Sequence, residues 1–291
     1  MRTVISASRR TDIPGFYMHW LEYHLRQGFV DVRNPVVKDK TYRVSLRPED
    51  VHTIVLWSKN YRPFLDSPVS RNPAYHWYFN FSLVDCPEWE RGVPPLEERL
   101  RQARELAARW SPHHINWRFD PILFWEGGRR NNLGAFPSLC DFMAGLGVFW
   151  CTFSFVTWYN KVKARKECRS LDFYDPPLSQ KVDILSGLSA YTRPRGITLE
   201  SCCNDELLAA EGISKGHCIH GPLLSRLAGE RCSLARDTSQ RTDCGCTKSS
   251  DIGSYTMSCP HQCFYCYAKP VEPVHRNMPQ SPNEGIAKND R

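Results

Sequence analysis

The chain has 291 residues, of which 41% are hydrophobic and 12% aromatic, and its formal net charge is +7. This length suits one large barrel or α/β domain, or two smaller ones, with a sizeable core. No apolar run approaches the roughly 18–20 residues that span a bilayer, and residues 1–10 lack a signal-peptide hydrophobic region, so we expect a cytoplasmic protein without membrane contact. The modest basic excess permits an anionic partner such as nucleic acid but is weak evidence for one.

The first third of the chain predicts strands at residues 3–8, 29–33, 51–57 and 75–84. Between the first two, Asp12 is a predicted helix N-cap, and Pro14 lies in the first turn. This helix is expected to run to about Gln27, where Gly28 ends it.

The pattern of alternating elements continues to residue 201. Helices are predicted at residues 95–110, 133–146 and 178–191, and strands at 114–119, 148–157 and 197–201. The strand at 148–157 is almost uniformly apolar, as is typical of a buried parallel strand. Seven strands with intervening helices predict a TIM-like (β/α) barrel, complete or partial. A doubly wound sheet is the alternative, but no Gly-rich nucleotide fingerprint follows the first strand.

Three regions are expected along the chain. Residues 1–201 form the barrel body, residues 202–269 a cysteine-rich segment that closes the barrel, and residues 270–291 a polar tail. Within the second region, residues 251–257 are either an eighth strand or an extended approach to the loop that follows.

The chain contains 13 cysteines, and nine of them lie within residues 202–266. An odd number in a reducing compartment argues against a disulfide framework, whereas metal sites cluster their cysteines. We interpret the four scattered cysteines as small buried hydrophobic residues: Cys86, Cys140, Cys151 and Cys168.

Cys259, Cys263 and Cys266 form a Cys-x3-Cys-x2-Cys pattern. Three thiolates from one loop can hold three irons of a cubane 4Fe–4S cluster and leave the fourth iron open to a small molecule. Zinc is the alternative, but zinc ligands usually come as two pairs. His261, inside this loop, is interpreted as a donor to the cluster or as an exposed residue, and not as a ligand.

A second set of cysteines comprises Cys202, Cys218, Cys244 and Cys246. Cys203 and Cys232 are alternative ligands for the same site. Four such ligands predict a second, auxiliary 4Fe–4S cluster, with a structural zinc ion as the alternative. Several buried thiols without a metal are the remaining interpretation. Either metal would organise the polar stretch at residues 237–250.

The run from Cys259 to Ala268, with Tyr265 and Tyr267 around the third cysteine, resembles the cluster loop of the radical S-adenosylmethionine superfamily, and in particular its spore photoproduct lyase branch. The resemblance implies that the open iron binds S-adenosylmethionine, with Tyr265 near the adenine. It also implies reductive cleavage of this cofactor to a 5′-deoxyadenosyl radical, with an electron from a donor such as ferredoxin or flavodoxin.

Over roughly residues 3–270, the chain resembles an uncharacterised bacterial family of radical-SAM-like proteins, which supplies no substrate. The shared segments are residues 6–14, 118–121 and 244–253. In most of the superfamily the cluster loop follows the first strand, whereas here it follows the last, so the barrel is expected to be circularly permuted.

Polar residues at the predicted strand ends are candidate cofactor contacts, because barrel active sites form there. They follow the first strand at Ser6, Ser8, Arg9, Arg10 and Asp12, and the fifth at Arg118 and Asp120. Arginines of this kind can clamp a carboxylate or phosphate. The alternatives are an N-cap role for Asp12, solvent exposure for the arginine pair, and a structural ion pair between Arg118 and Asp120.

The sequence therefore favours a radical S-adenosylmethionine enzyme of unknown substrate. A narrower hypothesis makes the substrate nucleic acid. The non-enzymatic hypotheses are an iron–sulfur protein for redox sensing or electron transfer, and a zinc-stabilised binding module.

Overall fold

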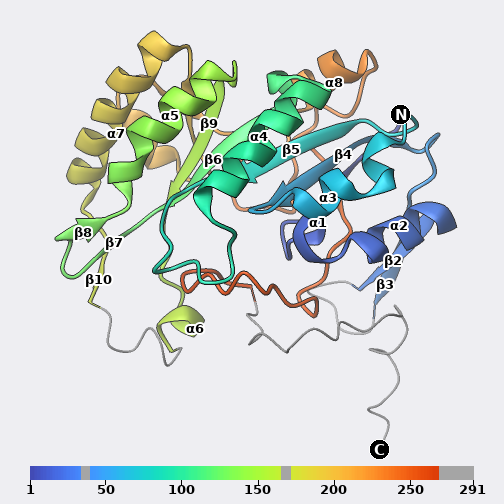
Figure 1. The fold of residues 1–291 in the computed structure, drawn as a ribbon, viewed down its shortest axis with the longest axis horizontal. Coiled ribbons are helices and arrows are strands. Elements are labelled where there is room, and N and C mark those ends of the chain that lie inside the picture. The colour runs from blue at the N-terminus through green and yellow to red at the C-terminus, as the bar shows by residue number, and fades with distance from the viewer. Residues whose placement is uncertain (34–39, 165–171, 269–291) are drawn as a thin grey trace, which may run out of the picture.

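The computed structural model describes residues 1–33, 40–164 and 172–268 (Figure 1). Its main sheet has eight strands in the order β12-β11-β9-β6-β5-β4-β1-β13, and all neighbours are parallel. The strands are β1 (Thr3–Ala7), β4 (Val51–Ser58), β5 (Trp77–Ser82), β6 (Ile115–Ile122), β9 (Trp150–Phe155), β11 (Thr198–Ser201), β12 (Ile213–Lys215) and β13 (Ser250–Asp251).

Each strand from β1 to β12 lies beside the next strand of this sheet in the sequence, and β13 pairs with the other side of β1. Because the chain returns from β12 to the far side of β1, this order fits both a barrel and a doubly wound sheet. Within the described residues no strand pairing joins β12 to β13. The structure thus confirms an α/β fold with a large parallel sheet, while closure into a barrel stays a prediction.

Helices α3 (Arg62–Asp66), α4 (Leu96–Trp110), α5 (Phe136–Gly145) and α7 (Leu178–Thr192) lie along one face of the sheet (Figure 1). Strand side chains on one face of the sheet, such as Phe79 and Trp117, are buried in the main core. Side chains on the other face, such as Val55 and Tyr78, form a second core with Cys218 and with helix α8 (Gly221–Ala228). The cysteine-rich segment therefore packs on the face that carries Val55 and Tyr78.

The first predicted helix is split into α1 (Ile13–Phe16) and α2 (Met18–Gln27). Asp12 caps α1 as predicted, since its side chain accepts from the Gly15 N–H. Gly28 ends α2 with a φ of 76°, the left-handed conformation that favours glycine.

The assignment of residues 29–33 to the barrel is wrong. They form β2 (Phe29–Arg33), which pairs antiparallel with β3 (Thr41–Ser45) in a separate two-stranded sheet. A further small sheet, not predicted, contains β7 (Phe124–Trp125), β8 (Arg130–Asn131) and β10 (Phe173–Tyr174). The short helix α6 (Asn160–Lys163) precedes β10.

Cys168 and the predicted tail at residues 270–291 lie outside the described residues. In the part of the chain that is described, helices that combine the length and the apolar character needed to cross a membrane are absent.

Candidate metal centres

The loop that carries Cys259, Cys263 and Cys266 packs against the segments that follow β1, β4 and β5 (Figure 1). Cys263 forms an isolated antiparallel bridge with Glu90. Next to it, the Phe264 N–H donates to Trp89 O at 3.0 Å, and the Gly92 N–H donates to His261 O at 2.9 Å. The three cysteines are thus held at the carboxyl ends of neighbouring parallel strands, where α/β proteins bind their ligands.

Asp12 joins this loop to the sheet. Its Oδ1 accepts from the Gly15 N–H, while Oδ2 accepts from Ser58 Oγ at 2.8 Å and from the Lys59 N–H at 3.0 Å. The same Oδ2 lies 2.7 Å from His261 Nε2, and His261 is 2% exposed. The interpretation of His261 as an exposed residue is therefore wrong, because its ring pairs with the carboxylate that caps α1.

The three thiols of the loop are close enough to influence one another. Burial raises the pKa of Cys259 to about 12, and the charges of Asp12 and Cys266 raise it as well. Burial also raises the pKa of Cys263 well above its ordinary value, with further contributions from Glu90, Cys266 and Cys259. Cation binding is the ordinary way in which such buried thiols become thiolates.

A buried ion pair lies beside Cys263. Lys59 Nζ lies 2.8 Å from Glu90 Oε1, and the Tyr265 hydroxyl donates to the same carboxylate oxygen. Glu90 is 3% exposed, and Arg99 approaches it at 4.0 Å. The sequence pattern gave no signal for Glu90, which stands in a loop without periodicity.

Two buried donor atoms after the end of β1 have no hydrogen-bond partner: Arg9 Nη2 and Thr11 Oγ1. A buried polar atom left unpaired costs about 1–3 kcal/mol, so such a group points to a polar ligand from outside the chain. Donors of this kind can bind a carboxylate or a phosphate.

The other candidates after β1 are engaged with residues 249–253. The hydroxyls of Ser6 and Ser8 donate to Asp251 at 2.9 and 2.8 Å, and the Arg9 N–H donates to it at 2.9 Å. Arg10 Nη1 donates to Gly253 O at 2.9 Å. These residues hold β13 against β1, and their predicted contacts with a cofactor stay predictions. Sequence reasoning did not single out Asp251.

The second set of cysteines is brought together on the sheet face opposite the helices. Cys202 Sγ lies 3.9 Å from Cys218 Sγ. Hydrogen bonds with the thiols of Cys218 and Cys244 lower the pKa of Cys246 well below its ordinary value. Cys203 hydrogen-bonds with Cys244 and so lies at the edge of the same set.

Cys232 stands apart from this set, because its thiol donates to Gly221 O under α8. Arg118 donates both to Cys218 Sγ and to Asp120, and Ser154 donates to Asp120. The predicted pair Arg118–Asp120 is therefore an ion pair that also touches a predicted metal ligand.

For the second set, an iron–sulfur cluster, a zinc ion and buried thiols without a metal remain the three interpretations. Two sulfurs of a tetrahedral zinc site are about 3.8 Å apart, close to the 3.9 Å between Cys202 and Cys218. Across residues 1–33, 40–164 and 172–268, however, no group of three or more His, Cys, Asp or Glu side chains could hold one metal ion as placed. A four-iron cluster does not need such a group, because each of its four ligands binds a separate iron.

Gly92 provides a direct test of how the first loop is seated. A Cβ on Gly92 would lie 2.2 Å from Pro260 O and 3.0 Å from the His261 backbone. We expect Gly92→Ala to displace the loop and to remove about four irons, as measured by iron and sulfide analysis. Gly134→Ala is the matched control, since its Cβ meets nothing within 4 Å. A full iron content in Gly92→Ala would show that the loop does not need this contact.

The protein is thus an α/β protein with a large parallel sheet. The second set of cysteines packs on one face of this sheet, and the Cys259–Cys266 loop lies at the carboxyl ends of its strands. The chain belongs to the family described as "Domain of unknown function (DUF1848)", whose model matches residues 4–268. A search of the curated proteins found no match. The family match includes all seven predicted metal-ligating cysteines but assigns no activity to them.

Proposed function

We propose that this protein is a radical S-adenosylmethionine enzyme of unknown substrate. The observation that carries the proposal is the anchored loop with Cys259, Cys263 and Cys266 beside buried donors that lack partners. When bound, the cluster would supply one-electron reduction of S-adenosylmethionine, with the electron from an external donor, and this reductive cleavage would provide the hydrogen-abstracting chemistry for a substrate.

The chain's own residues bind and orient the cofactors in this proposal. The three cysteines hold the first cluster, and the unpaired donors of Arg9 and Thr11 receive the carboxylate of S-adenosylmethionine. Glu90 fixes the Tyr265 hydroxyl, which sets the orientation of the ring predicted to lie near the adenine. The second set of cysteines relays electrons or binds substrate.

The sheet order supports the finer fold proposal, a circularly permuted TIM-like barrel. The loop follows β13, and β13 pairs with β1, so the loop of the last strand lies beside the entry residues of the first. In a closed barrel this is the same neighbourhood that a loop after the first strand would occupy. We place the protein in the cytoplasm, with ferredoxin or flavodoxin as its electron donor.

Metal analysis of protein purified without oxygen tests the proposal. Two clusters predict about eight irons and eight sulfides per chain, while about four irons and one zinc would assign zinc to the second set. Zinc without iron would contradict the proposal and favour a zinc-stabilised binding module.

Lys59 allows a further test of the first cluster, because its buried positive charge lies close to Cys263. Removing a positive charge beside a cluster disfavours the added electron, so Lys59→Met is expected to lower the midpoint potential by about 59 mV or more, a tenfold change in the one-electron equilibrium. Redox titration followed by electron paramagnetic resonance measures this potential.

Two variants separate charge from packing at this position. Lys59→Arg should keep the potential near that of the unmodified protein, and Lys181→Met, which breaks an ion pair with Asp175, should leave it unchanged. An unchanged potential in iron-loaded Lys59→Met would show that the Lys59 charge does not act on the cluster.

A further inference from the structure

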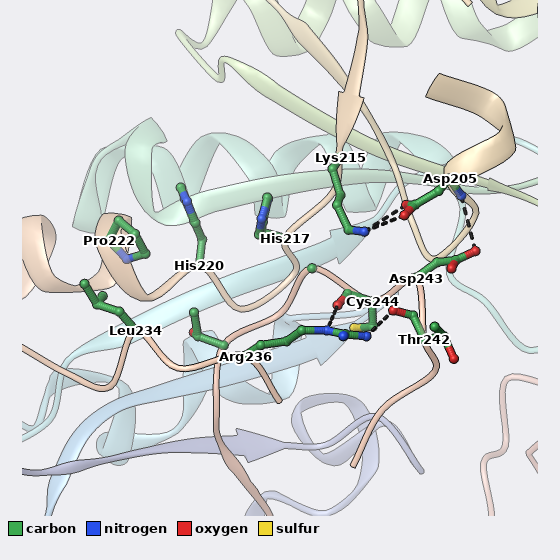
Figure 2. Close-up of a pocket in the computed structure, with 12 residues that line it drawn as sticks. Asp205, Lys215, His217, His220, Pro222, Leu234, Arg236, Thr242, Asp243 and Cys244 are labelled. Atoms are coloured by element: carbon green, nitrogen blue, oxygen red, sulfur yellow. Dashed lines mark hydrogen bonds and ion pairs between the residues drawn. The ribbon is translucent and has the colours of Figure 1, made fainter. Parts of the chain in front are cut away.

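A cavity of about 520 Å³ opens beside the second set of cysteines (Figure 2). Cys244 and Gly245 line it, together with residues from the end of β12, the start of α8 and the loop at residues 234–247. None of its lining residues belongs to the Cys259–Tyr267 loop or to the residues that anchor that loop. Its volume falls within the roughly 300–1,000 Å³ of small-molecule sites.

Both carboxylates that line the cavity are already engaged. Lys215 Nζ contacts the two oxygens of Asp205 at 3.0 and 2.6 Å. Asp243 accepts from the Asp205 N–H at 3.4 Å. These pairs leave little acidic capacity for a cationic ligand.

The hydrogen-bond donors of the cavity are less committed. Arg236 donates only to backbone carbonyls, among them Cys244 O at 3.3 Å, and within the described ranges no carboxylate lies at ion-pair distance from it. The rings of His217 and His220 are 4.8 Å apart, and the buried His220 Nδ1 has no hydrogen-bond partner. Figure 2 shows both histidines on one side and Arg236 on the other.

We propose that this cavity binds a small molecule that carries an oxyanion, either a carboxylate or a phosphate. A guanidinium without an acidic partner forms charge-assisted hydrogen bonds with such a group, and an imidazole nitrogen adds a neutral one. Because Cys244 lines the cavity, the ligand is held next to the second set of cysteines. A metal cation is not the proposed ligand of the cavity, since both of its carboxylates are already engaged.

Isothermal titration calorimetry of the metal-loaded protein tests this site, with sodium phosphate, sodium succinate and, at equal ionic strength, sodium chloride as titrants. We expect saturable binding of phosphate or succinate and none of chloride, and the titrant that saturates identifies the anion class. Arg236→Met and His220→Leu should each weaken binding at least tenfold. Arg129→Met, which removes an exposed arginine between β7 and β8, should bind like the unmodified protein.

Absence of saturable binding for both oxyanions, or unchanged binding in the two cavity variants, would overturn the inference. If Arg236→Met does not fold, His220→Leu decides the question alone, because Nδ1 of His220 has no hydrogen-bond partner within the described part of the chain that the substitution would remove. Iron is measured on the same samples. Binding without iron contradicts only the proposed function, and iron without binding contradicts only this site.

Discussion

The variant Cys263→Ala is expected to lose S-adenosylmethionine cleavage entirely, together with about four irons per chain. Cys263 is 7% exposed and stands at the point where the loop bridges Glu90, so no other cysteine can replace it without moving that loop. Metal analysis and an assay for 5′-deoxyadenosine measure the two losses.

Cys244→Ala is the matched comparison. It should lose the metal of the second set while the first cluster remains detectable by electron paramagnetic resonance. Cys140→Ala removes a buried thiol from α5, far from both sets in the sequence, and should retain all metal. Loss of both metal centres in Cys263→Ala and in Cys244→Ala would argue against two independent sites.

The largest expected loss of stability belongs to Asp12→Ala. Without the carboxylate, His261 Nε2 and the backbone N–H of Lys59 stay buried without this partner, Ser58 Oγ keeps only its bond to Asn60 O, and α1 loses its cap. Unpaired buried donors cost about 1–3 kcal/mol each and a lost cap about 1 kcal/mol. Allowing for relaxation, we expect the free energy of unfolding to fall by about 3–5 kcal/mol, as measured by urea denaturation.

An exposed carboxylate serves as the control for Asp12. Asp66 pairs with Arg62 on the surface of α3, so Asp66→Ala should change the free energy of unfolding by less than about 1 kcal/mol. Asp12→Asn keeps an acceptor oxygen and should fall between the two. A change below about 1 kcal/mol in Asp12→Ala would mean that Asp12 does not join the loop to the sheet.

Most main-sheet strands and their helices could be predicted because their periodicity reflects burial on one or both faces. The apolar run at β9 and the single apolar face of α4 are examples. Residues 29–33 were misassigned because their strand pattern does not identify its partner, and their alternating burial belongs to a hairpin. β12 has only three residues, too few for a periodic signal.

The site was predicted in part. The cysteine spacings grouped residues that interact within each set, while metal binding by them stays a prediction. The helix-start pattern correctly predicted Asp12 as a cap. The anchoring partners Glu90 and Asp251 could not be predicted, since their roles arise from contacts with residues more than 170 positions away in Glu90–Tyr265 and more than 240 in Asp251–Ser8. Cys202 and Cys203 both lie near the second set, so adjacency in sequence could not separate them.

The most direct test of the central claim is the formation of 5′-deoxyadenosine. Iron-loaded protein is incubated without oxygen with dithionite and S-adenosylmethionine, and the products are separated by chromatography. The account predicts 5′-deoxyadenosine from the unmodified protein and none from Cys263→Ala. Iron-loaded protein that forms no 5′-deoxyadenosine, even with candidate substrates present, would contradict it and favour an iron–sulfur protein for redox sensing or electron transfer.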